Sequence, residues 1–365
     1  MRILFDALSL DSRSSGTRSR LFGLLAALSP RADLEISALH GPRLPEEERA
    51  LLPGVRWLEV PKPPVGAALR AMRQGPVYRL IGQAAAADAV IADCVPFPSG
   101  VALVPTIHDL RHVKLAGIRG RLYRGALRKG LDRARVVHVV SQAVRDELVR
   151  FHPQVEERLA VVPNGVDTQH FHAREEVADA AVLEGLGLAP PYLLWVGHLE
   201  PRKDPQAALD VRVQLAERGL DLPIIFVGRG PCLPEEGLCW LESVRPDQRA
   251  GRVLRAVPTR DLPALYRHAS MTLATSRLEG FGIVPLEAAA CGCPVVATDI
   301  PAHVEVLGPG ALYAPPGDLS ALVSAALSVI YNLEDVAGLK ARAAERARLY
   351  TWENAAEAFV SSLTV

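Results

Sequence analysis

The chain has 365 residues, of which 49% are hydrophobic and 22% are charged. This balance excludes an intrinsically disordered chain, and the length suits two domains of ordinary size. The 41 basic and 41 acidic residues cancel, which argues against nucleic acid as the main partner. The charge is unevenly spread, because residues 1–172 hold 24 basic and 17 acidic side chains while residues 173–365 hold 17 and 24.

The start of the chain and its cysteines bear on where the protein works. The N-terminus becomes polar at Asp6, so it lacks the apolar core of a signal peptide. A run of the roughly 20 apolar residues that a spanning helix needs does not occur in the sequence. Five scattered cysteines favour buried thiols over a disulfide framework. We expect a cytoplasmic protein that is free to act at the inner membrane face.

In the first half of the chain, short apolar runs alternate with stretches of helical spacing. A helix is predicted over residues 18–28, where Ser29-Pro30 ends it. The predicted strands are residues 3–5, 34–39, 55–60, 88–92, 102–107 and 136–140. This βαβ rhythm is typical of a parallel, doubly wound sheet.

The same rhythm restarts after residues 168–190, which are polar and interpreted as a linker. A helix is predicted over residues 205–218. The strands predicted in this half are residues 192–196, 224–227, 253–257, 271–275 and 295–298. The sequence therefore predicts an α/β protein with two Rossmann-like domains, residues 1–172 and 173–350.

The most informative segment runs over residues 279–292, after a predicted strand. Pro285 suits the first turn of a helix, so the Gly280-Phe281-Gly282 loop lies just before a helix N-terminus. Free N–H groups at such a terminus attract phosphate, and glycine allows close approach. Glu279 and Glu287, the latter placed in the first helical turn, suit recognition of sugar and ribose hydroxyls. The alternative is a tight turn with two exposed acids.

A second segment, Gly197-His198-Leu199-Glu200-Pro201-Arg202-Lys203, also follows a strand and precedes a helix. Arg202 and Lys203 put two cations where a diphosphate would lie. Lys203 stands out because the chain has only five lysines. The alternative is a solvated basic turn in which Glu200 and Asp204 neutralise the two cations.

Together these segments resemble the retaining GT-B glycosyltransferases of family 4, and residues 279–287 look like the family's E-x7-E motif. The similarity covers nearly the whole chain. It continues through Ser141-Gln142, Val162-Pro163-Asn164-Gly165-Val166-Asp167, residues 291–302 and Thr351-Trp352-Glu353. The resemblance implies two Rossmann-like domains facing a central cleft. It also implies that the final helix, 352–363, crosses back, so that residues 351–365 join the N-terminal, acceptor-binding domain.

The resemblance also assigns roles to individual residues. The catalytic residues that it implies are His108 and Glu279 at the donor sugar and Arg202 and Lys203 at the diphosphate. Asp109, beside that histidine, is expected to support the loop. The donor-binding residues that it implies are Gly16, Gly197, His198, Val257, Gly280, Phe281, Gly282, Ile283, Val284 and Glu287. Among them, Glu287 would bind ribose, and Val257 would lie beside the base. Ser15 and His198 depart from the family's usual residues.

The function implied by the resemblance is hexosyl transfer from a nucleotide-diphosphate sugar to a glycan, lipid-linked or small-molecule acceptor. Configuration would be retained by front-face displacement, with cations in place of a metal ion and without a cofactor. His108-Asp109 together with residues 197–203 looks most like mannosyltransferases, which favours GDP-mannose. Two alternatives stay open: a nucleotide-sugar 2-epimerase of the same fold, and a non-catalytic accessory of a polysaccharide assembly complex.

Residues 111–135 form a basic stretch with nine basic residues and one acid. Its apolar residues recur at helical spacing and predict one apolar stripe on a basic amphipathic helix: Ile118, Leu122, Ala126, Leu127 and Leu131. One interpretation is a domain helix with a solvated arginine face. The other is attraction to anionic lipid or to a lipid-diphosphate acceptor at the membrane.

Overall fold

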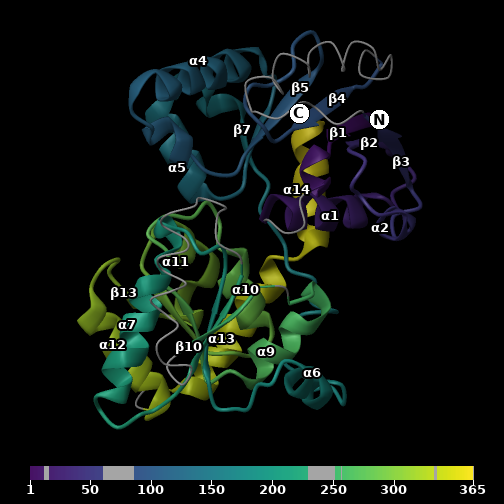
Figure 1. The fold of residues 1–365 in the computed structure, drawn as a ribbon. Coiled ribbons are helices and arrows are strands. Elements are labelled where there is room, and N and C mark those ends of the chain that lie inside the picture. Colours follow the sequence, from purple (N-terminus) through teal and green to yellow (C-terminus); the bar gives the residue numbers. More distant parts are fainter. Residues whose placement is uncertain (12–15, 61–85, 229–250, 256, 333–334, 365) are drawn as a thin grey trace. The chain divides into compact units, whose positions relative to one another are not determined.

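The computed structural model describes residues 1–11, 16–60, 86–228, 251–255, 257–332 and 335–364, and the chain forms two compact units (Figure 1). Unit 1 comprises Met1–Gly165 and Thr351–Val365, and unit 2 comprises Val166–Tyr350. Each unit has its own parallel sheet with flanking helices, so the predicted α/β class with two such domains is confirmed. Ser15 and the Pro-rich residues 61–64 lie outside the described residues.

The described residues of unit 1 build a sheet of order β3-β2-β1-β4-β5-β6-β7, in which neighbouring strands pair in parallel. The strands are β1 Arg2–Asp6, β2 Glu35–His40, β3 Val55–Glu59, β4 Ala89–Ala92, β5 Leu103–Ile107, β6 Val137–Val139 and β7 Leu159–Val161. The helices are α1 Gly16–Leu28, α2 Glu46–Ala50, α4 Gly117–Arg133, α5 Gln142–Phe151 and α14 Trp352–Leu363.

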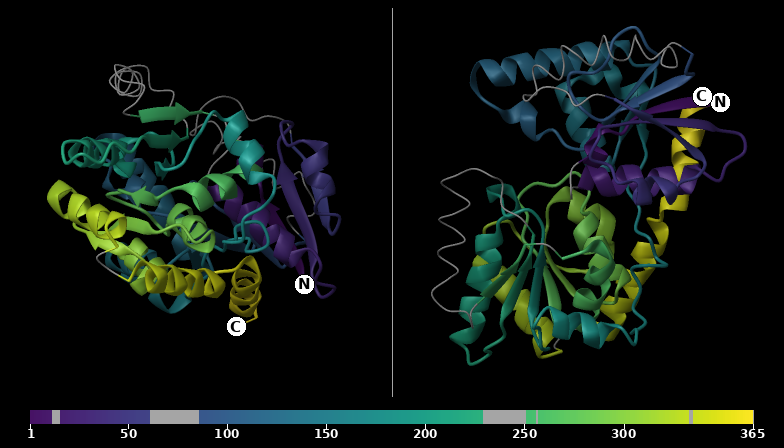
Figure 2. Two further views of the ribbon diagram at one scale, coloured as in Figure 1. Left: turned by 90° about the horizontal axis from the view of Figure 1, so that it is seen from below. Right: turned by 45° about the vertical axis from the view of Figure 1, so that its right-hand side comes forward.

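The C-terminal helix α14 is part of the core of unit 1. It lies beside α1 in both views of Figure 2, and the rings of Phe5 in β1 and Phe359 in α14 stack with centroids 5.6 Å apart. The two helices approach closely at Gly23, where an added Cβ would lie only 2.2 Å from Trp352 Cε2. The final helix therefore returns to the N-terminal unit, as predicted.

In unit 2, the described strands follow the order β10-β9-β8-β11-β12-β13, again with parallel neighbours. They are β8 Leu193–Val196, β9 Ile224–Val227, β10 Gly251–Leu254, β11 Met271–Ala274, β12 Val295–Thr298 and β13 Leu312–Ala314. The helices are α6 Asp179–Gly185, α7 Pro205–Ala216, α9 Leu262–His268, α10 Ile283–Ala290, α11 Pro301–Leu307, α12 Leu319–Ile330 and α13 Val336–Leu349. Helices α7 and α12 share one apolar core with the sheet, while α9, α10 and α13 pack together on its other face (Figure 1).

Three expectations differ from the structure. The strand predicted at 253–257 is Gly251–Leu254, because its partner β9 ends at Val227 and pairing stops there. The stretch 168–190, interpreted as a linker, contains α6, which a buried ion pair between Asp179 and Arg267 fixes to α9. The edge strands β7 and β13 were not predicted, since three residues are too few to show a period. Within the described residues, no helix is both long and apolar enough to cross a bilayer.

The stacked contact between α14 and β1 predicts a stability effect. Phe359→Ala should lower the free energy of unfolding by about 3–5 kcal/mol, because it removes a fully buried ring and leaves a cavity. Ser361→Ala, at an exposed position on the same helix, should change it by less than about 0.5 kcal/mol. Urea denaturation followed by circular dichroism measures both variants. A loss of less than about 1 kcal/mol for Phe359→Ala would show that α14 is not part of this core.

Candidate functional site

Two loops of unit 2 meet where the strand order of its sheet reverses. Strands β8 and β11 are neighbours there, and ligands of doubly wound sheets bind beyond the carboxyl ends of such strands. Loop 197–204 follows β8 and loop 275–282 follows β11. The backbone N–H of Arg277 donates to the carbonyl of Arg202 at 2.7 Å. The two segments that the sequence singled out are therefore brought together.

The first loop begins at Gly197, whose φ of +154° suits glycine. Its N–H donates to the carbonyl of Val227 at 2.9 Å. It packs so closely against the end of β9 that a Cβ on Gly228 would lie 1.7 Å from the Gly197 carbonyl oxygen. His198 follows, and its carbonyl accepts from the Glu200 N–H at 2.8 Å. Glycine at positions 197 and 228 thus lets the ends of β8 and β9 pack closely together.

The loop ends at Asp204, which connects it to helix α7. Asp204 has a left-handed φ of +46°, and its carboxylate caps the helix by accepting from the Ala207 N–H at 3.3 Å. Thr275 Oγ1 donates to the Asp204 carbonyl at 2.7 Å. The same carboxylate pairs with Arg277 Nε at 2.6 Å. These contacts hold the backbone beside Arg202 and Lys203 in place.

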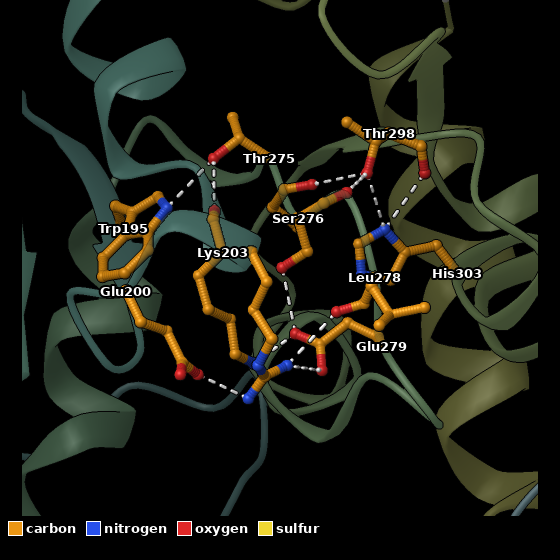
Figure 3. Close-up of polar contacts among 11 residues, drawn as sticks. Trp195, Glu200, Lys203, Thr275, Ser276, Leu278, Glu279, Thr298 and His303 are labelled. Carbon is orange, nitrogen blue, oxygen red and sulfur yellow. Dashed lines mark hydrogen bonds and ion pairs between the residues drawn. The ribbon is translucent and has the colours of Figure 1, made fainter. Parts of the chain in front are cut away.

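Glu279 accepts charged hydrogen bonds from both cations of the first loop (Figure 3). Its Oε1 accepts from Lys203 Nζ, and its Oε2 accepts from Arg202 Nη1 at 3.2 Å. Ser276 Oγ adds a hydrogen bond to Oε1 at 2.9 Å. On its other side, Arg202 Nη2 lies 2.5 Å from Glu200 Oε1. Two cations and two carboxylates therefore form a cluster without net charge.

The electrostatics of the cluster are dominated by Glu279. Burial opposes its ionisation, but Lys203 and then Arg202 outweigh burial and lower the pKa of Glu279 to about 2. The side chains of Lys203 and Glu279 are only 15% and 12% exposed. The alternative of a solvated turn is right about Glu200 as a partner of Arg202. It fails for Asp204, whose carboxylate caps α7 and pairs with Arg277 instead.

The second loop ends in the N-terminus of α10. Gly282 adopts φ +102° directly before the helix, and Ile283 and Val284 are its first two residues. N–H groups at these positions have no partner within their own helix. Gly280 and Phe281 are buried, and the Phe281 ring packs edge-on against Tyr350 at 5.4 Å. The predicted phosphate cradle is thus a glycine turn anchored by an aromatic ring.

His303 is a member of this region that the sequence did not single out. It is buried, and burial lowers its pKa, although the nearby Glu279 opposes the shift. Its Nδ1 lies 3.0 Å from the Thr298 carbonyl, and a Cβ on Gly282 would lie 3.2 Å from its Cδ2. His303 therefore packs against the turn at Gly282. No local pattern marks it, because it comes from α11, after a different strand.

Glu287 lies in the second turn of α10 and not, as predicted, in the first, because the helix starts at Ile283. Burial raises the pKa of Glu287 to about 8, although the hydrogen bond that its Oε2 accepts from Tyr266 Oη at 3.0 Å opposes this. Without a ligand, the carboxyl group is therefore mostly protonated at neutral pH. Val257, predicted to lie beside the base, is partly buried and follows β10 at the same edge of the sheet.

The remaining predicted residues belong to unit 1. Gly16 is the first residue of α1, and His108 follows β5. His108 Nε2 lies 3.4 Å from Oδ2 of Asp93, a buried carboxylate that follows β4. Asp109 accepts from the Arg111 N–H at 3.0 Å, which fits its predicted role in supporting the loop. The predicted contacts of Gly16 and His108 with a donor bound to unit 2 stay predictions.

Arg20 is a second residue that no sequence motif indicates. It is buried in α1 and donates to the carbonyls of Val162 and Pro163 at 2.9 and 3.1 Å and to Asn164 Oδ1 at 2.8 Å. Burial lowers the pKa of Arg20 to about 10, against the opposing charge of Asp93. Arg20 therefore binds the segment 162–167, which is one of the motifs on which the family resemblance rests.

Among the described residues, no three His, Cys, Asp or Glu side chains are grouped as metal ligands.

Comparison with known families identifies the chain. Residues 15–170 match the family described as Glycosyltransferase Family 4, and residues 190–332 match Glycosyl transferases group 1. The chain belongs to these glycosyltransferases. The family predicted from the sequence motifs is therefore confirmed.

Several glycosyltransferases are similar in sequence. O-antigen chain mannosyltransferase B of Escherichia coli is 31% identical over 244 residues, which cover 65% of this chain and 62% of that protein. A D-inositol 3-phosphate glycosyltransferase of Saccharomonospora viridis is 31% identical over 290 residues, which cover 72% of this chain and 64% of that protein. The chain thus spans less than two thirds of the length of these relatives.

Solved structures confirm the fold. Anabaena HepE, crystallised with UDP and glucose, superposes with a TM-score of 0.77 at 20% identity, covering 100% of this chain and 99% of that one. Sucrose-phosphate synthase of Thermosynechococcus elongatus superposes with a TM-score of 0.79 at 18% identity, covering 99% of this chain and 98% of that one. The chain has the predicted GT-B architecture of two Rossmann-like domains.

The raised pKa of Glu287 predicts a pH effect on the stability of the ligand-free protein. Its pKa of about 8 in the folded state lies above the ordinary 4.5, so its stabilising contribution is complete below pH 4.5 and is lost as the pH rises through 8. Between about pH 5 and pH 8, the free energy of unfolding of the wild type should therefore fall by about 1 kcal/mol per pH unit relative to that of Glu287→Gln.

Thermal unfolding midpoints at several pH values measure this difference. Glu217→Gln, which neutralises an exposed carboxylate at the end of α7, serves as the control and should keep a constant offset from the wild type. A constant offset for Glu287→Gln as well would contradict a raised pKa.

Proposed function

We propose that the protein is a hexosyltransferase that transfers a sugar from a nucleotide-diphosphate donor to an acceptor hydroxyl. The observation that carries the proposal is the cluster of Arg202, Lys203 and Glu279. The cluster lies where the strand order of the unit 2 sheet reverses, and α10 begins directly after the second of the two loops that form it. Cations and free N–H groups suit a diphosphate, and a carboxylate suits sugar hydroxyls. The mannosyl- and inositol phosphate glycosyltransferases that resemble the chain support the same reaction class.

The donor's diphosphate binds Arg202, Lys203 and the N–H groups of Ile283 and Val284 at the start of α10. Gly197 lets the backbone approach the phosphates, with His198 next to it. On the nucleoside side, Glu287 accepts hydrogen bonds from the ribose hydroxyls, and Val257 packs beside the base. Ribose binding favours the ionised carboxylate of Glu287, so it offsets the cost of burying that charge.

The sugar of the donor lies against the Gly280-Phe281-Gly282 turn. Glu279, which the low pKa keeps ionised, accepts hydrogen bonds from sugar hydroxyls. The roles that the resemblance gives to His108 and Gly16 of unit 1, at the donor sugar and at the phosphates, stay predictions. Asp93 is the carboxylate that faces the imidazole of His108.

Transfer retains the configuration of the sugar by displacement on one face. The acceptor oxygen bonds to the anomeric carbon while the bond from that carbon to the phosphate oxygen breaks, and the departing phosphate takes the acceptor's proton. Negative charge accumulates on the leaving diphosphate, where Arg202 and Lys203 stabilise it. These two cations supply the positive charge, so the proposed reaction uses neither a metal ion nor a cofactor.

GDP-mannose is the proposed donor, and a glycan, a lipid-linked molecule or a small molecule is the proposed acceptor. The named relatives support this choice, since they include an O-antigen chain mannosyltransferase and a lipopolysaccharide core mannosyltransferase. HepE, which shares the fold, was crystallised with UDP-glucose, so UDP sugars are the competing donors. A thermal-shift panel decides between them, because a ligand at 100 times its Kd adds about 2.7 kcal/mol of stability.

Lys203→Ala tests the diphosphate role directly. It should lower the rate of sugar transfer at least about 100-fold, because the variant loses one of the two charges that stabilise the leaving group. Lys340→Ala, at an exposed position on α13, is the matched control and should keep the wild-type rate. Product formation from a radiolabelled donor measures both, with circular dichroism to verify folding. Near-normal turnover of Lys203→Ala would overturn the assignment.

Glu200 provides a second test, because it competes with the diphosphate for Arg202. Glu200→Gln should raise the affinity for the nucleoside diphosphate about fivefold, since a partly exposed ion pair contributes about 1 kcal/mol. Glu217→Gln removes the same charge at the other end of α7 and should leave the affinity unchanged. Isothermal titration calorimetry measures both. Weaker binding by Glu200→Gln would mean that Glu200 positions Arg202 and does not compete for it.

A further inference from the structure

Helix α4 of unit 1 exposes large apolar side chains to solvent. Ile118 and Leu122 are 68% and 69% exposed, and Leu115, just before the helix, is 45% exposed. The C-terminal half of the same helix behaves differently, because Leu127 and Leu131 are fully buried. The single apolar stripe expected from the sequence is therefore wrong. The N-terminal apolar residues face away from the core of unit 1, and they form an apolar ridge of Leu115, Ile118 and Leu122.

Basic side chains surround this ridge. Ile118, Leu122 and Lys129 are four and seven residues apart, so they follow one line along the helix. Arg119 and Arg121 lie on either side of that line. Among the residues that the structure describes, none forms an ion pair with Arg119, Arg121 or Lys129.

Other basic residues nearby are committed to contacts within unit 1. Arg124 Nη1 donates to the carbonyls of Val113 and Leu115 at 2.9 Å each. The Arg128 guanidinium lies 4.8 Å from the centre of the Phe151 ring, and Lys114 pairs with Glu147 at 2.9 Å. The basic residues named here thus divide into a structural group and a group that faces outward with the apolar ridge.

We propose that this face of α4 docks on an anionic lipid surface, with the apolar ridge inserted at the level of the headgroups. The face consists of Leu115, Ile118, Leu122, Arg119, Arg121 and Lys129. Cations beside exposed aliphatic side chains are the features of a helix that lies in a membrane interface. A nucleic acid would engage the cations but leave the aliphatic ridge in water. The inference deepens the proposed function, since a lipid-linked acceptor lies at such a surface.

Vesicle co-sedimentation tests the proposal without donor or turnover. The full chain should bind phosphatidylcholine vesicles that contain about 30% phosphatidylserine and should not bind vesicles of phosphatidylcholine alone. Raising the salt from about 0.1 M to about 0.5 M should weaken binding several-fold, because it screens the charges. Because no sugar is involved, binding to vesicles stands even where the transfer assays fail, and failure to bind leaves the transfer assignment untouched.

Two sets of variants distinguish the contribution of the basic residues to vesicle binding from that of the apolar ridge. Arg119→Gln/Arg121→Gln/Lys129→Gln should lose at least about tenfold in vesicle affinity, and Ile118→Ser/Leu122→Ser should lose a similar factor. Arg119→Lys/Arg121→Lys should bind like the wild type, because attraction to anionic lipid depends on the positive charge and not on the shape of the guanidinium group. All of these positions are exposed, and thermal unfolding verifies that the variants fold.

The matched controls remove equivalent groups from unit 2. Arg174→Gln/Arg260→Gln/Arg348→Gln removes the same charge from exposed positions, and Val177→Ser/Leu349→Ser removes exposed aliphatic side chains. Both should bind vesicles like the wild type. The proposal is overturned if the wild type fails to bind anionic vesicles or if the α4 variants bind as tightly as the wild type. It is also overturned if the controls lose as much affinity as the α4 variants.

Discussion

The rest of the candidate site depends on the ion pairs that the carboxylate of Glu279 forms with Lys203 and Arg202. These ion pairs connect the loop after β8 to the loop after β11 through side chains, as the Arg277–Arg202 hydrogen bond does through the backbone. Burying one carboxylate alone would be unfavourable, but the two cations more than compensate and hold its pKa at about 2. The site is therefore organised before a ligand enters, and its cations are already close together.

The same cluster balances its own charges in the absence of a ligand. Glu200 and Glu279 balance Arg202 and Lys203 in the absence of a donor, so no charge is left unpaired. In the proposed complex, the diphosphate takes over the cations, and Glu279 is released towards sugar hydroxyls. Glu287 complements this from the nucleoside side, because its raised pKa keeps it neutral until ribose hydroxyls solvate the carboxylate. The excess positive charge in the first half of the chain belongs elsewhere, in large part to α4.

Much of the fold and of the donor loops was predictable, because glycine and proline mark strand ends and helix starts. Gly197, Gly282 and Pro285 show where the backbone turns, and parallel topology brings such turns to one edge of a sheet. Partners distant in sequence were not predictable. His303 and Tyr266 reach the site from other helices, and no local pattern selects Glu200 over Asp204 as the partner of Arg202. Helical periodicity likewise identifies apolar stripes, but it does not show that the rest of unit 1 leaves Ile118 and Leu122 uncovered.

The most direct test of the central claim is the contribution of the diphosphate to binding energy. Isothermal titration should compare a nucleoside diphosphate with the same nucleoside, in the wild type and in Arg202→Gln/Lys203→Gln. If the cluster binds the diphosphate, the wild type should prefer the diphosphate by at least about 100-fold, and the double variant should lose most of that preference. An undiminished preference in the double variant would contradict the account, because the phosphates would then be bound elsewhere.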